Sequence, residues 1–148
     1  MNDSVEILLV EDNPSDIKLA MHAFRKHNLA NRVKVLRDGA EALEYIFCTD
    51  RYAERNALGY PKVVLLDLKL PLVDGLEVLR RIKSDPATRS IPVVVMTSSS
   101  EDRDIVESYQ LGVNSYVQKP VDFEQFMDAV SKLGLFWLLV NKVPYPTD

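Results

Sequence analysis

The segment Lys62-Val63-Val64-Leu65-Leu66-Asp67 decides the fold, because a run of aliphatic residues ends in a single carboxylate. Such an uninterrupted apolar run predicts a strand that is buried on both faces, as in a parallel sheet. Two other apolar runs end in polar side chains: Val5–Val10 before Glu11-Asp12, and Val93–Met96 before Thr97-Ser98. In open α/β folds, ligands bind at the carboxyl ends of the strands. We therefore expect these acidic and hydroxyl side chains to share one site.

Strand-like and helix-like patterns alternate along the whole chain. The strand-like segments are Val5–Val10, Arg32–Leu36, Val63–Asp67, Ile91–Thr97 and Val113–Gln118. Helices are expected from Pro14 to about Asn28, over Ala40–Phe47, from Gly75 to about Asp85, over Glu101–Leu111, and from Asp122 onward. The segment Cys48–Pro61 reads as a long surface loop with some helix. Five such units predict an α/β, doubly wound, five-stranded parallel sheet of order 2-1-3-4-5, with Glu11, Asp12 and Asp67 at its switch point.

Composition limits the classes of protein that fit. A length of 148 residues predicts one domain, 1–148, with a sizeable core. The net charge of −4 gives no reason to expect nucleic acid as a partner. The one cysteine, Cys48, excludes an intrachain disulfide and fits a cytoplasmic location. The N-terminus lacks a signal-peptide pattern, and the most apolar stretch, Leu133–Val140, is too short to span a membrane.

The polar groups at the strand ends suit phosphoryl transfer. Three carboxylates, Glu11, Asp12 and Asp67, cannot all stay ionised at close range without a counter-charge, and Mg²⁺ is the usual hard cation in phosphoryl chemistry. Lys119 follows the fifth strand and adds a positive charge, while Thr97 adds a hydroxyl donor. We expect Asp67 to attack as a carboxylate nucleophile, with Lys119 and Thr97 neutralising the phosphoryl oxygens.

Each of these residues also has an ordinary explanation when it is taken alone. Acidic residues at strand ends commonly sit in turns or cap helices, and Ser100 is well placed to cap the helix from Glu101. A lysine before a proline is usually solvated. The combination at four strand ends is what favours a phosphoryl site.

In combination, these motifs resemble the receiver domain of two-component response regulators, from about Val5 to Leu135. The matching motifs are Val10-Glu11-Asp12-Asn13, Leu65-Leu66-Asp67 with Pro71 and Asp74-Gly75, Thr97-Ser98, and Lys119-Pro120. The resemblance implies a flavodoxin-like receiver fold in which Asp67 is the phosphoacceptor and Thr97 and Lys119 contact the phosphoryl group. It also implies that Glu11, Asp12, Asp67 and the backbone carbonyl of Lys69 bind Mg²⁺, and that the Lys119–Pro120 bond is cis.

The same resemblance implies a signalling phosphoacceptor, fed by a sensor histidine kinase, rather than an enzyme with turnover. Tyr116 matches the switch aromatic of the family, although a half-buried strand tyrosine explains it equally well. A haloacid-dehalogenase-like phosphatase would need a second aspartate two residues after the nucleophile, where this chain has Lys69. A pseudo-receiver scaffold would not need the intact acidic, hydroxyl and lysine set. His22 and His27 are expected to be surface residues rather than members of a phosphohistidine relay.

The C-terminal segment is apolar on all sides, from Leu135 to Val140. We expect a helical extension over about 134–148 and no output domain. Exposed apolar surface of this kind usually marks an interface. The expected use is a homodimer through Phe136, Trp137 and Leu138 together with Tyr116, while a partner protein or intrachain packing are the alternatives. This tail and the long loop also resemble the stand-alone regulators of cyanobacterial and bacterial phytochromes.

Overall fold

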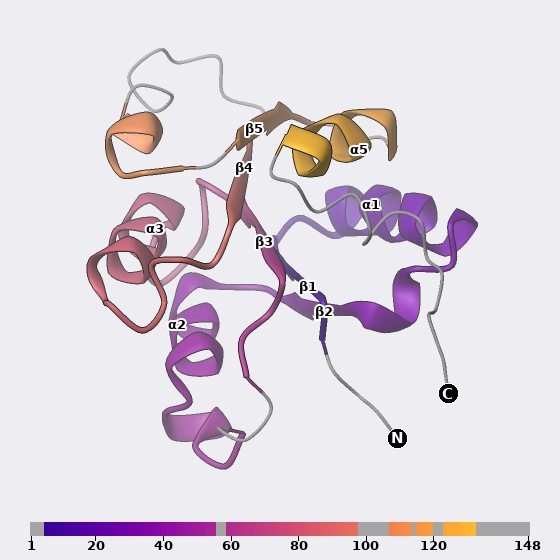
Figure 1. Ribbon diagram of the computed structural model, residues 1–148. Coiled ribbons are helices and arrows are strands. Elements are labelled where there is room, and N and C mark those ends of the chain that lie inside the picture. The colour runs from indigo at the N-terminus through magenta and orange to yellow at the C-terminus, as the bar shows by residue number, and fades with distance from the viewer. Residues whose placement is uncertain (1–4, 56–58, 98–106, 114, 120–122, 133–148) are drawn as a thin grey trace, which may run out of the picture.

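The sheet has the predicted strand order. The structure is a computed structural model that describes residues 5–55, 59–97, 107–113, 115–119 and 123–132 (Figure 1). Its strands are β1 (Ile7–Val10), β2 (Val33–Leu36), β3 (Val63–Asp67), β4 (Val93–Thr97) and β5 (Ser115–Gln118). All neighbouring strands pair in parallel, in the order β2-β1-β3-β4-β5. The doubly wound topology predicted from the sequence is therefore confirmed.

Helices cover both faces of this sheet. They are α1 (Pro14–Lys26), α2 (Gly39–Phe47), α3 (Gly75–Ser84) and α5 (Phe123–Lys132), with short 3₁₀ turns η1 (Ala30–Arg32) and η2 (Asp50–Tyr52). Figure 1 shows α1 and α5 on one face and α2 and α3 on the other. Residues 107–110 are also helical, in agreement with the end of the helix expected over Glu101–Leu111. The rest of that expected helix lies outside the described residues.

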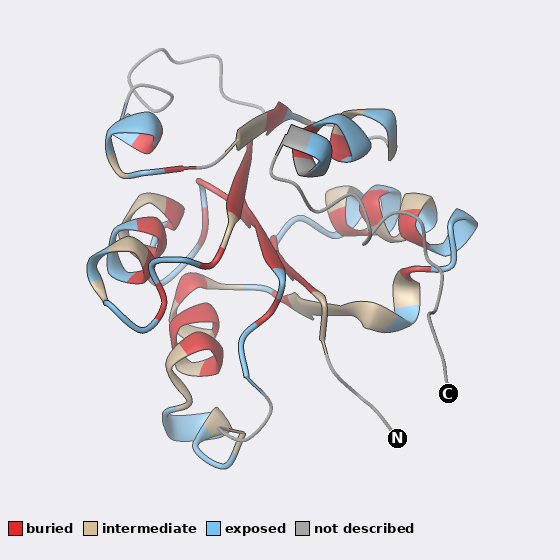
Figure 2. Ribbon diagram, in the orientation of Figure 1, coloured by how far each residue is buried: buried red, intermediate tan, exposed pale blue. Residues whose placement is uncertain are grey.

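Two apolar cores hold these layers together. Along β1, Leu8 and Val10 face the core under α2 and α3, whereas Ile7 and Leu9 face the core under α1 and α5. This alternation is the period of two expected for a strand buried on both faces. Figure 2 shows the buried strands at the centre and the exposed outer faces of the helices. No helix among the described residues is long and apolar enough to cross a membrane.

Local chemistry sets where the elements begin. Asn13, Asp38 and Asp74 each cap a helix, because each side chain accepts a hydrogen bond from the backbone N–H three residues later. The fourth strand begins at Val93 rather than at the predicted Ile91. Pro92 lies between them and has no N–H to contribute to a strand ladder. The first and fifth strands also begin two residues later than predicted, at Ile7 and Ser115.

Candidate functional site

The switch point of the sheet brings two buried carboxylates together. Val10 at the end of β1 is paired with Leu66 in β3, so Glu11 and Asp67 follow side by side at the carboxyl edge. Glu11 is 1% exposed and Asp67 is 3% exposed. The exposed Asp12 completes the group, and one oxygen from each of the three carboxylates lies within 4.8 Å of the others. The predicted convergence of Glu11, Asp12 and Asp67 is therefore present in the structure.

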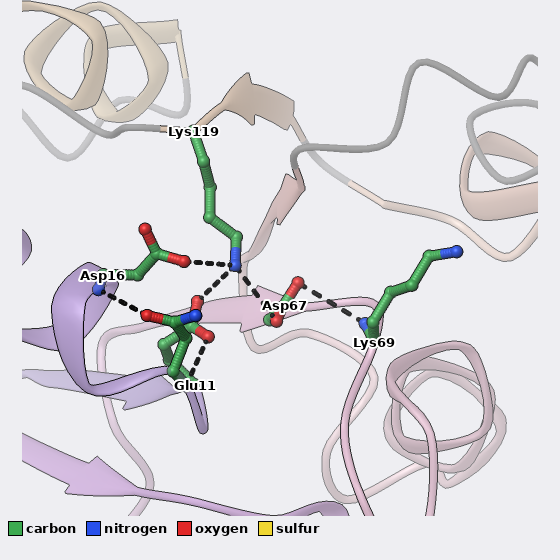
Figure 3. A network of polar contacts seen from close by, with 6 residues as sticks. Glu11, Asp16, Asp67, Lys69 and Lys119 are labelled. Carbon is green, nitrogen blue, oxygen red and sulfur yellow. Dashed lines mark hydrogen bonds and ion pairs between the residues drawn. The ribbon is translucent and has the colours of Figure 1, made fainter.

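Lys119 supplies the positive charge of this site (Figure 3). Its Nζ lies 2.7 Å from Glu11 Oε1, 3.0 Å from Asp16 Oδ2 and 3.2 Å from Asp67 Oδ2. The lysine side chain is only 9% exposed, so these carboxylates replace most of its water. Sequence reasoning placed Lys119 at this edge but missed Asp16, which lies in the first turn of α1 and reads in the sequence as an ordinary helix-start acid.

Burial dominates the protonation of the two inner carboxylates. Loss of water raises the pKa of Glu11 and the pKa of Asp67, and the nearby ammonium of Lys119 opposes both shifts only in part. Burial alone would lower the pKa of Lys119, but its close contacts with the carboxylates of Glu11 and Asp16 outweigh burial and raise that pKa. One lysine thus faces several carboxylates, and the site carries an excess of negative charge that favours a further cation.

The oxygen atoms of the site fit a hard divalent cation. Glu11 Oε2 accepts a hydrogen bond from the Asn13 N–H at 3.0 Å, whereas buried Oε1 has the ion pair with Lys119 but no hydrogen bond of good geometry. Among the hydrogen bonds of the described residues, Asp67 Oδ1 accepts a long one of 3.4 Å from the Lys69 N–H. Carboxylate oxygens with spare capacity are the ligands that Mg²⁺ prefers. The set of Glu11, Asp12 and Asp67 therefore fits divalent metal binding.

Glycine lets the helix after β3 approach the end of this strand closely. The Gly75 N–H donates to the carbonyl of Leu68 at 2.9 Å. A Cβ added to Gly75 would lie 2.1 Å from the Asp67 carbonyl oxygen and 2.6 Å from Leu68 Cα, closer than real Cβ contacts allow. Only glycine therefore lets α3 begin directly against the backbone of Asp67.

A second glycine holds the tip of the same loop. The Gly39 N–H at the start of α2 donates to the Pro71 carbonyl at 3.2 Å. Leu72 follows Pro71, has a φ of 71° and is 80% exposed. The Val73 N–H closes a tight turn around Leu72 by donating to the Pro71 carbonyl at 2.8 Å. A leucine with positive φ in a tight turn is strained, and such strain clusters at functional loops. Sequence reasoning predicted the loop but not this conformation.

The structure describes the remaining predicted site residues only in part. Thr97 ends β4 and pairs with Gln118, but its side chain lies outside the described part of the chain, as do Pro120, Phe136, Trp137 and Leu138. The Lys69 side chain is exposed and points away from Asp67 (Figure 3), and a metal contact by its carbonyl stays a prediction.

Tyr116 and the two histidines lie at or near the surface. Tyr116 is half-buried, with its ring centroid 6.3 Å from that of Tyr109, so it lies in the expected strand position. His22 and His27 are exposed, in agreement with the expectation that they are surface residues.

The family is established by comparison with known proteins. The model of the response regulator receiver domain matches residues 7–131, so the chain belongs to this family. The bacteriophytochrome response regulator AtBRR is 55% identical in sequence and has a TM-score of 0.83, over 95% of this chain and 100% of AtBRR. The phosphorylated cyanobacterial phytochrome response regulator RcpA is 42% identical with a TM-score of 0.75, over 95% of this chain and 99% of RcpA.

A curated relative extends the range of pathways in which similar chains occur. The probable methanogenesis regulatory protein FilR2 of Methanothrix harundinacea is 44% identical over 97% of this chain and 90% of its own length. The chain is therefore similar, over nearly its full length, both to phytochrome response regulators and to a protein named for a different process.

Proposed function

We propose that this protein is a response regulator that accepts a phosphoryl group on Asp67 and thereby switches a protein-binding surface. The observation that carries the proposal is the position of Asp67, which is buried at the switch point with its Oδ2 3.2 Å from Lys119 Nζ. Its carboxylate lies within 4.8 Å of ligand atoms on Glu11 and Asp12. A structural ion pair would need neither the extra carboxylates nor this edge of the sheet.

The chemistry follows from these contacts. A carboxylate oxygen of Asp67 attacks phosphorus, and the bond from phosphorus to the donor atom breaks on the opposite side. The donor is the phosphohistidine of a sensor kinase or a small acyl phosphate. Lys119 stays within reach of Asp67 and neutralises charge on the transferred oxygens. Glu11, Asp12 and Asp67 would hold Mg²⁺, which supplies further positive charge to the phosphoryl oxygens.

The partners are proposed from the family and from the most similar proteins. A receiver domain takes its phosphoryl group from a histidine kinase, and likeness to AtBRR and RcpA supports a phytochrome kinase as that donor. The 44% identity to FilR2 makes a donor outside light signalling the competing assignment. Phosphotransfer from a purified phytochrome kinase, measured against a kinase with another sensor, separates the two.

The readout proposed for the switch is the face that carries Tyr116. An added phosphoryl group brings about −1.5 to −2 charges and three strong acceptor oxygens to the site. A shift of Thr97 toward these oxygens would leave space for the Tyr116 ring. We propose that the same face forms a homodimer with Phe136, Trp137 and Leu138. Truncation after Gly134 should then give a folded monomer by light scattering, and a persistent dimer would contradict this use of the tail.

The main proposal is tested by incubation with acetyl phosphate, followed by intact mass spectrometry. The native protein should gain one phosphoryl group in Mg²⁺ and much less in EDTA, whereas Asp67→Asn should gain none. The matched control is Asp50→Asn, which removes an exposed carboxylate outside the site. A native protein without an adduct would support a scaffold that only binds proteins. An adduct that persists in Asp67→Asn would show that Asp67 is not the acceptor.

A further inference from the structure

Asp16 is a partner of Lys119 that the proposed chemistry does not require. It lies in the first turn of α1, and its Oδ2 is 3.0 Å from Lys119 Nζ, closer than Asp67 Oδ2 at 3.2 Å. Figure 3 shows Asp16 and Asp67 approaching the ammonium from different sides. Asp16 is also the most accessible of the three partners, with a side chain that is 28% exposed against 4% for Asp67.

The usual role of an acidic residue at this helix position does not account for the contact. In a capping box, the acid of the first turn accepts a hydrogen bond from the backbone N–H of the cap residue. Here the Asn13 N–H donates to Glu11 Oε2 instead, at 3.0 Å. The Asp16 N–H is satisfied by Asn13 Oδ1, also at 3.0 Å. The carboxylate of Asp16 is thus left for Lys119.

Three carboxylates lie around the ammonium of the lysine. Asp16 Oδ2 and Asp67 Oδ2 accept hydrogen bonds from it, and Glu11 Oε1 is paired with it by charge at 2.7 Å. An ammonium has only three N–H groups, so new acceptor oxygens on a phosphoryl group at Asp67 compete with these contacts. Glu11 is almost fully buried, so water does not replace the lysine there. Asp16 is partly exposed, so water can replace the lysine at the least cost.

We propose that Asp16 is a positioning residue that holds Lys119 in the resting state and releases it when a phosphoryl group binds at Asp67. The inference rests on the proposed function and adds a regulatory step to it. Asp16 competes with the phosphoryl group for the same ammonium, and its negative charge also opposes the added charge. Both effects make Asp16 disfavour the phosphorylated state. Removing the charge therefore strengthens binding of a phosphoryl group at this site.

The test is the affinity for beryllofluoride, a phosphoryl analogue, at saturating Mg²⁺, measured by ¹⁹F NMR. Asp16→Asn keeps the shape of the side chain and removes its charge, and it should bind about threefold more tightly, since partly exposed ion pairs contribute modestly. Asp16→Glu should restore the native affinity. The control Glu54→Gln removes an exposed charge outside the site and should bind as the native protein does. Unchanged or weaker binding by Asp16→Asn would overturn the inference.

A second measurement asks whether Asp16 acts through Lys119. In a double-mutant cycle, Asp16→Asn should raise the unfolding constant about threefold more in the native background than in Lys119→Met. Equal effects in both backgrounds would mean that Asp16 only supports α1, which contradicts the inference. The two proposals fail in different ways. If the native protein binds no beryllofluoride and forms no adduct, the phosphoacceptor function fails. If the native protein binds beryllofluoride and forms the adduct, but the Asp16 variants bind beryllofluoride with the native affinity, only the role of Asp16 fails.

Discussion

Two clusters of charged residues in this molecule use the same chemistry in different settings. The proposed phosphoacceptor site surrounds Lys119 with buried carboxylates at the edge of the sheet. The other cluster, here called the α2 corner, consists of Glu41, Glu44, Tyr45, Arg51, Tyr52 and Arg55 on α2, η2 and the residues that follow η2. In the α2 corner, Arg51 Nε lies 2.7 Å from Glu44 Oε1, and the arginine side chain is 54% exposed.

The pKa shifts of the acids point in opposite directions. The hydrogen bond from Arg51 lowers the pKa of Glu44, as expected for an ordinary surface pair. Burial raises the pKa of Asp67 and of Glu11 despite the nearby lysine. Burial and the hydrogen bond to Glu41 also raise the pKa of Tyr52 to about 12, so its hydroxyl stays a donor at neutral pH. The α2 corner is satisfied within itself, whereas the site retains a need for positive charge.

The largest expected effect comes from removing the cation of the site. In EDTA, Lys119→Met should lower the free energy of unfolding by about 3–5 kcal/mol, because it leaves buried carboxylates without their partner. Mg²⁺ should then stabilise this variant more than the native protein, because the cation binds the folded state only. Urea unfolding with and without Mg²⁺ measures both. Lys18→Met, an exposed lysine on α1, is the matched control. A loss no larger than that of the control would contradict the charge balance described for the site.

The close approach of α3 to Asp67 gives the next effect. Gly75→Ala places a Cβ where the Asp67 carbonyl oxygen lies, at 2.1 Å, so the backbone has to shift. We expect a loss of about 1–3 kcal/mol, the usual cost of overpacking, together with slower adduct formation from acetyl phosphate. Urea unfolding and the initial rate of phosphorylation are the measurements. Native stability and a native rate in this variant would show that the loop tolerates the displacement.

The α2 corner is expected to matter for stability alone. The Arg55 guanidinium donates to the carbonyls of Tyr45 and Gly59 and lies 3.9 Å from the centre of the Tyr45 ring. Arg55→Ala should cost about 1–3 kcal/mol, since the Tyr45 carbonyl loses its two guanidinium donors. Phosphorylation of the folded variant should remain at the native rate. A slower rate at full folding would mean that the two clusters are coupled.

The smallest effect is a difference between the two clusters in how stability changes with pH, measured in EDTA. The raised pKa of Asp67 means that the folded state keeps a proton that the unfolded state releases above about pH 4. The native protein should therefore lose stability relative to Asp67→Asn as pH rises through the folded pKa. Glu44 has a lowered pKa, so the native protein should lose stability relative to Glu44→Gln as pH falls below about 4. If both stability differences, native against Asp67→Asn and native against Glu44→Gln, changed with pH in the same direction, the contrast between the clusters would be contradicted.

Sequence reasoning reached the site through strand ends, and this explains both its success and its gaps. Apolar runs such as Val63–Asp67 have a simple period, and parallel pairing brings their ends to one edge, so Glu11, Asp67 and Lys119 were predictable. Asp16 was not, because its role depends on the direction of a side chain in a helix and on Glu11 occupying the cap N–H. The turn at Leu72 was also missed, since a leucine seldom adopts positive φ and is held there by the contacts around it.

The central claim is that the phosphoryl group resides on Asp67. Borohydride reduces an acyl phosphate to an alcohol, so reduction after treatment with acetyl phosphate marks the acceptor permanently. Peptide mapping should find the reduced side chain at Asp67 in the native protein, in amounts that depend on Mg²⁺ and fall sharply in Lys119→Met. Reduction at Glu11, Asp12 or Asp16 in place of Asp67, or no reduced residue at all, would contradict the account.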